Sequence, residues 1–530
     1  MKFVDVWQGL MGSLSGCPPE VINRPVTDVV VDSRAVRPGA LFVALPGEKT
    51  DGHLYVGDAF LRGAIAAIAE PRSPALGLSA SYVAQSGAIT RQETGPHMPS
   101  AATSEGGPPY VFVVPDSLAG LQRLASFWRG QMAATAIAIT GSVGKTTTKE
   151  TVADVLEQHY VTLRSEGNLN NEIGLPLTLL RLRPEHQRVV LEMGMYALGE
   201  ISSLCRLARP RIGVVTNVGP AHLERLGTIE RIAEAKAELV QSLPSSDEGG
   251  VAVLNADDPL VRAMAGLTRA RVFTYGLSEG ADLWADEISS EGLQGTRFRL
   301  HWGRETYHLH LPMLGRHSVH TALRAAAVGL ADGLSWTEII TGLEQVRGQL
   351  RLMVAPGLRD TLLIDDTYNA SPESMLAALN LLEDLARRAE ALPATQGGPD
   401  EELSRGRRPI AVLGDMIELG SYEEEGHRLV GGRAAQVVGY DPSSRGTGGP
   451  TRRGGAGKLV TVGLRAQWIA DEAAAAGMLS ADIHATESNA DAIAVLQGLI
   501  RPGDVILIKG SRALGMETIV DALSRPRPRG

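Results

Sequence analysis

A glycine-rich stretch between a predicted strand and a predicted helix carries the strongest chemical signal in the sequence. Residues 136–150 read AIAITGSVGKTTTKE, in which an apolar run leads to a tight turn at Gly141 and Gly144. In such a turn backbone N–H groups can converge on phosphate oxygens, and the start of the following helix adds about half a positive charge. Lys145 can then reach the outer phosphates and Thr146 can hold Mg²⁺. The stretch therefore predicts a phosphate-binding loop.

This loop departs from the general eight-residue pattern, because Ile139 stands where that pattern has its first glycine. An ordinary turn is the alternative interpretation, but the position between an apolar run and a helix start favours phosphate binding. The predicted nucleotide contacts in the loop are Gly141, Ser142, Val143, Gly144, Lys145, Thr146 and Thr147.

Polar residues follow the strands that we expect beside this loop. Apolar runs predict a parallel sheet with strands at 136–140, 189–192, 212–216, 251–254 and 272–275. Glu192 closes one of these strands, and His222 and Asn255 come after two others. Each alone is readily explained as a cap or turn residue, but in open α/β sheets the carboxyl edge is the ligand crevice. We therefore expect a binding site at this edge.

The chemistry of this edge suits a magnesium ion bound to ATP phosphates. A carboxylate, an imidazole and a hydroxyl are available from Glu192, His222 and Thr146. Lys236, in a helix predicted from 229 to 243, is harder to explain, because an ammonium group cannot ligate a metal unless it is neutral or modified. Its alternative interpretation is a solvated helix cation.

The composition is that of an ordinary globular protein. A chain of 530 residues is long enough for about three domains. With 44% hydrophobic residues and a net charge of −9, it lacks the basic character of nucleic-acid-binding proteins. Lysine supplies only 7 of the 51 basic residues. Because the pKa of lysine, unlike that of arginine, shifts readily on burial, each lysine is a candidate for special chemistry.

Cysteine content and hydropathy indicate the compartment. Cys17 and Cys205 are too few and too far apart for a disulfide framework or a zinc site. Residues 14–17 resemble a lipoprotein cleavage box, but Asp5 and Gln8 interrupt the apolar run that a signal peptide needs. No run approaches the roughly 18–20 apolar residues of a membrane span. We expect a cytoplasmic, monomeric protein with no membrane insertion.

A small α/β unit precedes the phosphate loop. The residues from Pro71 to Pro109 interrupt it, and they are rich in Pro, Ser, Gly, Ala and Thr. Such a composition cannot bury enough apolar surface to offset chain entropy, so most of this segment is predicted to be a mobile insertion. The predicted elements of the unit are strands at 26–32, 41–45 and 110–115, a helix at 56–62 and an apolar run at 64–69, with a helix at 117–131 leading onward.

A series of sequence blocks over nearly the whole chain resembles the Mur ligases of peptidoglycan synthesis, in the order of that family. The blocks are VDSRAVRPGALFVALPGEKTDGH, ITGSVGKTTTKE, GNLNNEIGLPLTLL, LEMGM, TNVGPAHLERLGTIERIAEAKAEL, LNADDP, DDTYNASPESMLAAL, LGDMIELG and IKGSRALGME. The resemblance implies an α/β protein of three domains. These are a UDP-substrate domain at 1–116, a central parallel-sheet ATPase at 117–346 and a C-terminal Rossmann-like domain at 347–530.

The resemblance also implies roles for individual residues at the nucleotide. It makes Lys236 a carbamate, which would turn a cation into an oxygen ligand of magnesium. The implied catalytic residues are Lys145, Lys236, His222 and Glu192, and the implied metal ligands are Thr146, Glu192, His222 and Lys236. Asn255 falls where the family meets adenine, and Arg351 and Asp366 fall where the third domain touches ATP. Leu350 precedes Arg351, at the position where the family usually has glycine.

The C-terminal third resembles the branch of the family that adds D-alanyl-D-alanine, and the Asp-Asn-Pro-Arg tetrapeptide of the diaminopimelate-adding branch is absent. A cation with small hydroxyls can hold the dipeptide carboxylate, and Lys509 and Arg512 are the candidates. A structural strand-to-helix turn is the alternative for this segment. Inserts at 392–408 and 441–458 are expected to be surface loops. The substrate contacts implied are Ser33, Arg34, Asn168, Asn170, Asn171, Asn369, Lys509, Ser511 and Arg512.

The resemblance implies an ATP-dependent amide ligase acting on UDP-N-acetylmuramoyl-tripeptide and D-alanyl-D-alanine, with ATP and Mg²⁺. The γ-phosphoryl group would pass to the terminal carboxylate of the tripeptide, and the dipeptide amine would attack the acyl phosphate. Two alternatives stay open. One is another amide ligase of the superfamily, such as a folylpolyglutamate synthetase or a different Mur ligase, and the other is a non-catalytic NTP-dependent regulator. The third residue of the tripeptide, diaminopimelate or lysine, also stays open.

Overall fold

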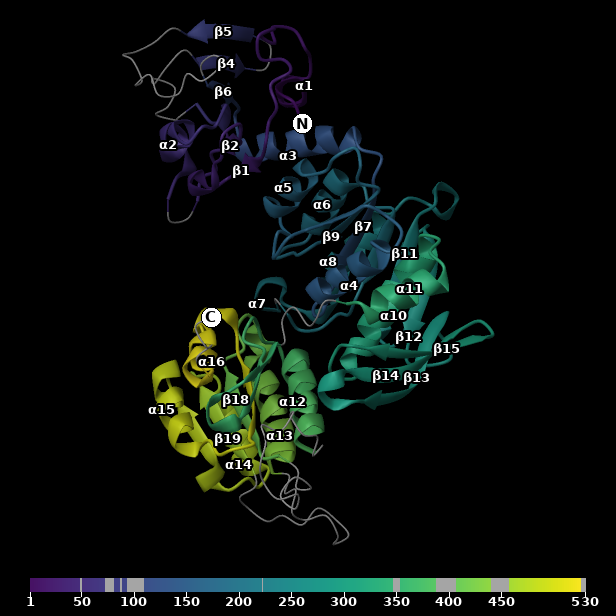
Figure 1. Cartoon of the computed structure of the whole chain (residues 1–530), viewed down its shortest axis with the longest axis vertical. Coiled ribbons are helices and arrows are strands. Elements are labelled where there is room, and N and C mark those ends of the chain that lie inside the picture. Colours follow the sequence, from purple (N-terminus) through teal and green to yellow (C-terminus); the bar gives the residue numbers. More distant parts are fainter. Residues whose placement is uncertain are drawn as a thin grey trace.

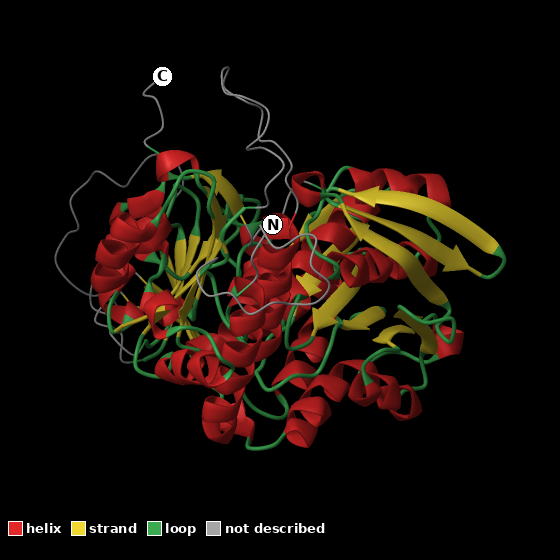
Figure 2. Ribbon diagram, turned by 90° about the horizontal axis from the view of Figure 1, so that it is seen from below, coloured by secondary structure: helices red, strands yellow, loops and turns green. Residues whose placement is uncertain are grey.

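The computed structural model describes residues 1–47, 50–71, 81–85, 88–92, 109–221, 223–346, 353–387, 407–439 and 457–525. His222, Arg351 and nearly all of the two predicted surface inserts lie outside these residues. Three sheets follow one another along the longest axis, with the N-terminal sheet at one end and the C-terminal sheet at the other (Figure 1). Helices flank each of them (Figure 2).

The N-terminal sheet has four parallel strands in the order β1-β2-β3-β6. Phe3 and Trp7 on the first helix pack against Phe112 of β6, so the start of the chain belongs to this core. The elements are α1 (Phe3–Met11), β1 (Val29–Val30), β2 (Leu41–Val43), α2 (Val56–Leu61), β3 (Ala66–Ala69), β4 (Ser81–Gln85), β5 (Ala88–Gln92) and β6 (Tyr110–Val113). The first predicted strand, 26–32, shortens to two residues.

The segment from 71 to 109 contains regular structure, which the composition did not predict. Strands β4 and β5 pair antiparallel as a separate two-stranded sheet, with Ser81 opposite Gln92 and Gln85 opposite Ala88. The hairpin contains short runs with β-branched residues such as Val83 and Ile89, which favour strands. The average composition of the whole segment does not reveal such short runs. Residues 72–80, 86–87 and 93–108 lie outside the described part of the chain.

The central sheet has nine strands in the order β15-β14-β13-β12-β11-β10-β7-β9-β8. The strands from β13 to β8 are parallel, as predicted, while β13, β14 and β15 form an antiparallel extension. The strands are β7 (Thr135–Thr140), β8 (Thr162–Arg164), β9 (Arg188–Glu192), β10 (Ile212–Val215), β11 (Val251–Asn255), β12 (Arg271–Gly276), β13 (Leu283–Ser290), β14 (Thr296–Trp302) and β15 (Glu305–Leu311).

Helices cover both faces of this sheet. Two of them, α4 and α10, pack against each other beside β12, and this contact positions one wall of the site described below. The helices are α3 (Ser117–Gly130), α4 (Lys145–Leu156), α5 (Gly174–Leu180), α6 (Glu200–Ala208), α7 (Leu223–Leu226), α8 (Ile229–Gln241), α9 (Pro259–Ala263), α10 (His317–Ala331) and α11 (Trp336–Glu344).

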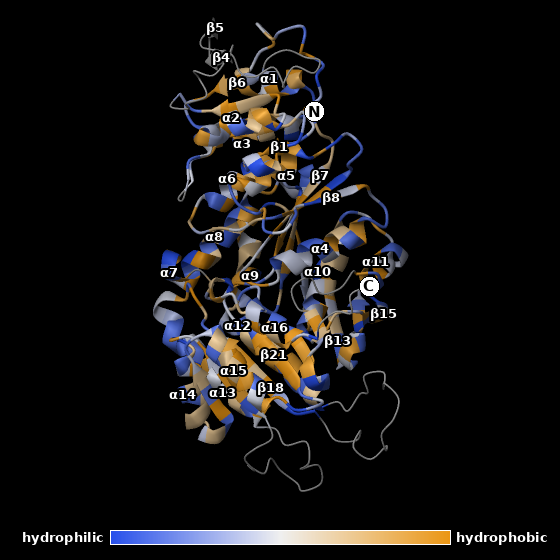
Figure 3. Cartoon of the chain, turned by 60° about the vertical axis from the view of Figure 1, so that its left-hand side comes forward, coloured by the Kyte–Doolittle hydropathy of each residue, from blue (hydrophilic) through white to orange (hydrophobic). Residues whose placement is uncertain are grey.

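The C-terminal sheet has six strands in the order β16-β17-β21-β18-β19-β20, with only β16 antiparallel to its neighbour. Its central strands are apolar and lie between the helices (Figure 3). The elements are β16 (Met353–Pro356), β17 (Leu362–Asp365), α12 (Pro372–Arg387), β18 (Pro409–Gly414), α13 (Glu423–Val438), β19 (Lys458–Val462), α14 (Gln467–Ala475), β20 (Ile483–Thr486), α15 (Asn489–Leu499), β21 (Val505–Lys509) and α16 (Glu517–Leu523). In the described residues, no helix has the length and apolarity needed to cross a membrane.

Candidate active site

The predicted phosphate loop forms the turn between β7 and α4. Gly144 has φ +83° and caps the helix, and Gly141 has φ +144°. A Cβ on Gly141 would lie 1.9 Å from Thr216 Oγ1, so any other residue would displace Thr216, which follows β10. The shortened loop is therefore built by backbone that only glycine tolerates.

The residues after β10 hold the loop in place. Asn217 accepts a hydrogen bond from Val143 N–H at 2.8 Å and donates one to Val143 O at 3.0 Å. The Ser142 hydroxyl donates to Gly219 O at 3.0 Å and accepts from Gly219 N–H at 2.9 Å. In the sequence Asn217 is only a polar residue that follows an apolar run, and its pairing with the loop depends on the neighbouring positions of β10 and β7 in the sheet.

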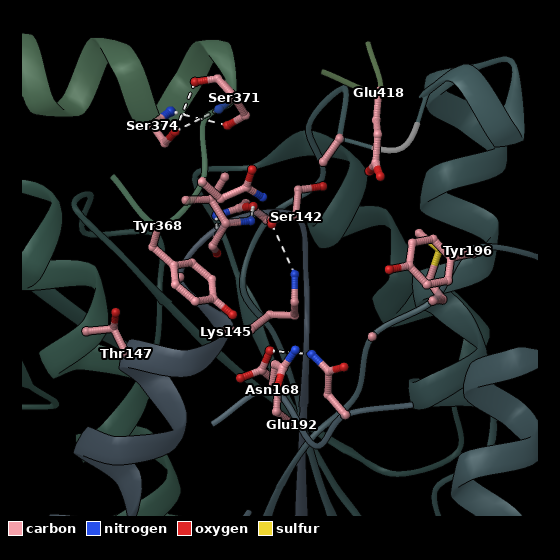
Figure 4. Close-up of a pocket in the computed structure, with 18 of the residues that line it drawn as sticks. Ser142, Lys145, Thr147, Asn168, Glu192, Tyr196, Tyr368, Ser371, Ser374 and Glu418 are labelled. Carbon is pink, nitrogen blue, oxygen red and sulfur yellow. Dashed lines mark hydrogen bonds between the residues drawn. The ribbon is translucent and has the colours of Figure 1, made fainter. Parts of the chain in front are cut away.

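Lys145 folds back over its own loop. Its Nζ donates to Gly141 O at 2.7 Å. It also donates to Ser142 O at 3.1 Å (Figure 4). These carbonyls are weaker partners than phosphate oxygens, since charge-assisted hydrogen bonds are stronger than bonds to neutral acceptors. The ammonium group is thus held at the loop, where phosphate oxygens of a bound triphosphate can replace the two carbonyls as its hydrogen-bond partners.

A hydroxyl, a carboxylate and an amide side chain lie together beside the loop. The Thr146 hydroxyl donates to Glu192 Oε2 at 2.6 Å, and Asn170 Nδ2 donates to Glu192 Oε1 at 2.8 Å. Thr146 and Glu192 are both buried. The sequence predicted both as magnesium ligands, and the structure brings their oxygens together. His222, the third predicted ligand, lies outside the described residues.

Lys236 is buried on α8, with 2% of its surface exposed. It has no hydrogen bond or ion pair with any residue that the structure describes. Burial first, and then the positive charge of Lys145, hold the pKa of the Lys236 amine well below its usual value. Burial of an unpaired ammonium group costs several kcal/mol, which favours the neutral form of this amine. The interpretation as a solvated helix cation is wrong for this position.

The edge of the central sheet opens into a cavity of ≈ 1370 Å³ that is lined by residues of the central and C-terminal parts of the chain. Asn255 lines it at the end of β11 and donates to Thr216 O at 3.0 Å. The predicted residues that line the cavity are Ser142, Val143, Gly144, Lys145, Thr147, Asn168, Asn170, Asn171, Glu192, Asn255, Asp366, Asn369, Lys509, Ser511 and Arg512. Asn171 also caps α5, accepting hydrogen bonds from the N–H groups of Ile173 and Gly174.

The predicted dipeptide-binding residues have unequal surroundings. Lys509 is almost fully buried, and its Nζ lies 2.7 Å from Asp366 Oδ2 and donates to Asn369 O at 2.8 Å. The buried Ser511 hydroxyl accepts from Ile417 N–H at 2.9 Å. Arg512 is exposed, and its guanidinium lies 5.3 Å from the ring centre of Tyr368. Of the cations of this segment, Arg512 is the accessible one.

Two predicted substrate contacts, Ser33 and Arg34, are not among the residues that line the cavity. The Arg34 side chain is 83% exposed and pairs with Asp32, at 2.7 Å from Nη2 to Oδ2. Hydrogen bonds from Arg34 lower the pKa of Asp32 to about 2. Ser33 and Arg34 lie on the N-terminal unit. Any role of these two residues in binding therefore concerns a different part of the substrate from the part in the cavity.

The sequence did not single out several other lining residues. His317, His320, Thr321 and Arg324 share one face of α10, and Glu373 lies in the first turn of α12. Burial first, and then nearby positive charges, lower the pKa of His317 to about 4. The spacing i, i+3, i+4, i+7 was a visible signal, but it is equally typical of a helix face packed in a core.

Family models match two parts of the chain. Residues 25–104 match the Mur ligase family catalytic domain, and residues 139–329 match the Mur ligase middle domain. A Mycobacterium tuberculosis protein named UDP-N-acetylmuramoyl-tripeptide–D-alanyl-D-alanine ligase is 36% identical over 529 residues, covering 98% of this chain and 96% of that protein. The chain belongs to the Mur ligase family.

Solved structures agree with this membership. A MurF from Acinetobacter baumannii has a TM-score of 0.74 and 29% identity, and the match covers 98% of this chain and 97% of that one. A MurF ligase from Thermotoga maritima, solved in complex with ADP, has a TM-score of 0.69 and 26% identity, with 93% and 96% covered. Within the Mur ligases, the chain belongs to the MurF branch.

Proposed function

We propose that the protein joins D-alanyl-D-alanine to the terminal carboxylate of UDP-N-acetylmuramoyl-tripeptide, using ATP. The observation that carries the proposal is one cavity lined by the phosphate loop, by Glu192, whose carboxylate accepts from the buried Thr146 hydroxyl, and by the C-terminal residues Asn369, Lys509 and Arg512. A full set of this kind argues against a non-catalytic regulator. The Mur ligase sequence of the N-terminal part, matched at 25–104, argues against a folylpolyglutamate synthetase.

Phosphoryl transfer comes first in the proposed reaction. The γ-phosphoryl group of ATP passes to the tripeptide carboxylate, giving an acyl phosphate and ADP. Lys145 leaves its two loop carbonyls and follows the charge of the moving group, while the backbone N–H groups of the loop hold the phosphates that stay behind. No covalent bond to the protein is required, so positioning and charge supply the catalysis.

Amide formation follows. The amine of D-alanyl-D-alanine attacks the acyl carbon with its lone pair, the bond from carbon to the phosphate oxygen breaks, and the amine gives up a proton. The products are the pentapeptide and phosphate. Arg512, as the accessible cation of the segment, binds the carboxylate of the dipeptide and leaves its amine directed toward the acyl phosphate.

The donor set fits magnesium. Thr146 and Glu192 supply oxygens 2.6 Å apart, and Lys236 carries a desolvated amine able to take up CO₂ as a carbamate. Together with His222, these residues would hold the metal, which neutralises charge on the phosphates when bound. Because ATP and nucleotide-linked precursors are the substrates, we expect the reaction in the cytoplasm.

An acceptor screen tests the proposal. ADP formation is measured with UDP-N-acetylmuramoyl-tripeptide carrying either diaminopimelate or lysine, with and without D-alanyl-D-alanine. We expect ADP release that needs both peptide substrates, and mass spectrometry should find the pentapeptide. ADP release with a UDP-dipeptide and a free amino acid would instead identify a different Mur ligase. ATP hydrolysis at a rate that does not depend on any of these peptide substrates would exclude a ligase.

A further inference from the structure

Arg324 lies on α10 and lines the cavity next to the phosphate loop, although only 4% of its surface is exposed. A Cβ built on Gly144 would lie 3.1 Å from its Nη1, which places the guanidinium directly against the loop backbone. The residue is 176 positions from Thr148 in sequence, and the packing of α10 on α4 brings the two together.

The hydrogen bonds of Arg324 use only part of its donor capacity. Nε donates to His320 O at 3.0 Å, and Nη1 donates to Thr148 Oγ1 at 2.6 Å. Among the described residues, Nη2 has no acceptor and the guanidinium has no carboxylate partner. A buried guanidinium without an anion is costly, and burial accordingly lowers the pKa of Arg324.

A second buried arginine shows what a purely structural role looks like in this chain. Arg129, on α3, directs all three of its nitrogens to main-chain carbonyls, at Ala208, Met132 and Ala134, with distances of 2.8 to 3.0 Å. It does not line the cavity. Arg324 differs from it in the unused Nη2 and in facing the cavity.

The charges around Arg324 add to the argument. Lys145 and Lys509 line the same cavity, and the charges of Arg324, His320 and Lys509 contribute to the low pKa of His317. Lys509 is paired with Asp366, but Lys145 and Arg324 both bring positive charge to the phosphate loop, which an anionic ligand would neutralise. A polyphosphate is the anion that the neighbouring loop is built to take.

We propose that Arg324 binds the phosphate chain of ATP at its α-phosphate end, so the inference rests on the proposed use of ATP. Lys145 and Thr146 serve the outer phosphates. Arg324 approaches from the other helix, against Gly144 and Thr148, and thus meets the phosphate chain nearer the nucleoside. Its Nη2 then gains the acceptor that the described protein residues do not supply.

Nucleotide binding to purified full-length variants tests this role by calorimetry, with ADP and adenosine as the probes. Arg324→Met should weaken ADP binding roughly 10- to 100-fold, as expected for a charged hydrogen bond, and leave adenosine binding unchanged. Arg129→Met is the matched control, and it should keep the wild-type affinity for both ligands even if it lowers Tm. Arg324→Gln retains a side chain that can bond Thr148, so it provides the same comparison if the methionine variant does not fold.

Wild-type ADP affinity in a folded Arg324 variant would overturn the inference, as would an equal loss of ADP and adenosine binding, which would indicate a distorted site. Failure of the wild-type protein to bind ADP is a separate result. That result would contradict the proposed use of ATP and not only the role of Arg324.

Discussion

Lys509 Nζ and Asp366 Oδ2 lie 2.7 Å apart in an ion pair that joins the end of β21 to the residue after β17. The lysine side chain is 2% exposed and the aspartate side chain 16%. The family resemblance assigned Asp366 to ATP and Lys509 to the dipeptide, yet the two residues hold each other. We infer that Lys509 positions Asp366 and Asn369, and that Arg512 makes the contact to the dipeptide.

Arg512→Ala should raise the KM for D-alanyl-D-alanine roughly tenfold or more, because it removes a charged contact to the carboxylate. The KM for ATP should change little. Steady-state kinetics with each substrate varied in turn measures both values. An unchanged KM for the dipeptide would contradict this assignment.

Lys509→Met should destabilise the protein by about 3–5 kcal/mol, because it leaves the Asp366 carboxylate without its buried partner. Chemical denaturation of the variant and of Arg512→Ala, which breaks no buried pair, gives the comparison. If Lys509 only contacted the dipeptide, the two variants would have the same free energy of unfolding.

Lys145→Ala should lower kcat roughly a hundredfold or more, since the lysine neutralises charge that grows as the γ-phosphoryl group moves. ATP binding should suffer less, because Lys145 already has two loop carbonyls as partners before ATP arrives. Single-turnover phosphate release and ATP binding separate the two effects. Near wild-type turnover would refute the assignment of the phosphate loop.

Lys236→Ala should abolish turnover while the fold survives, and short carboxylates such as acetate should restore part of the activity by supplying oxygen ligands. Lys236→Arg should also be inactive, because a permanent cation would repel the metal. Turnover assays with added acetate and mass spectrometry of the intact wild-type protein, for a bound CO₂, check this. Wild-type activity of the arginine variant would rule out the carbamate.

Deleting residues 71–109 and joining the ends with a short linker should leave turnover largely intact, because the four-stranded sheet is formed by β1, β2, β3 and β6 without the hairpin. Removing 93–108 alone is the milder control, since it keeps β4 and β5. Loss of folding in the larger deletion but not in the smaller one would mean that the hairpin supports the N-terminal unit.

Local sequence signals predicted the central sheet well. The strands expected at 136–140, 189–192 and 251–254 became β7, β9 and β11 with ends shifted by at most one residue. Buried parallel strands are continuous apolar runs, so their limits are clear in a sequence. The short edge strand β8 and the antiparallel strands β13 to β15 were not predicted, because their residues alternate and are partly polar.

Site residues that depend on long-range packing were beyond local reasoning. The spacing of glycine and lysine identified the phosphate loop, since all of its residues are neighbours in the sequence. Arg324 reaches the phosphate loop only because α10 packs on α4. Lys509 reaches Asp366 only because β21 lies beside β17. The local sequence marked Lys509 as a candidate cation but gave no sign of its pairing with Asp366, and it gave no sign of Arg324 at all.

Gly219 lies between the phosphate loop and helix α12 of the C-terminal domain. On one side it exchanges two hydrogen bonds with Ser142 of the phosphate loop, and on the other a Cβ added to it would lie 2.9 Å from Glu373 Oε1 on α12. A nucleotide that shifts Ser142 therefore shifts the contact with the C-terminal domain. If the acceptor binds against Glu373, thermodynamic linkage would make the affinities for nucleotide and acceptor depend on each other equally, and this turn would couple the two binding events without a separate regulatory site.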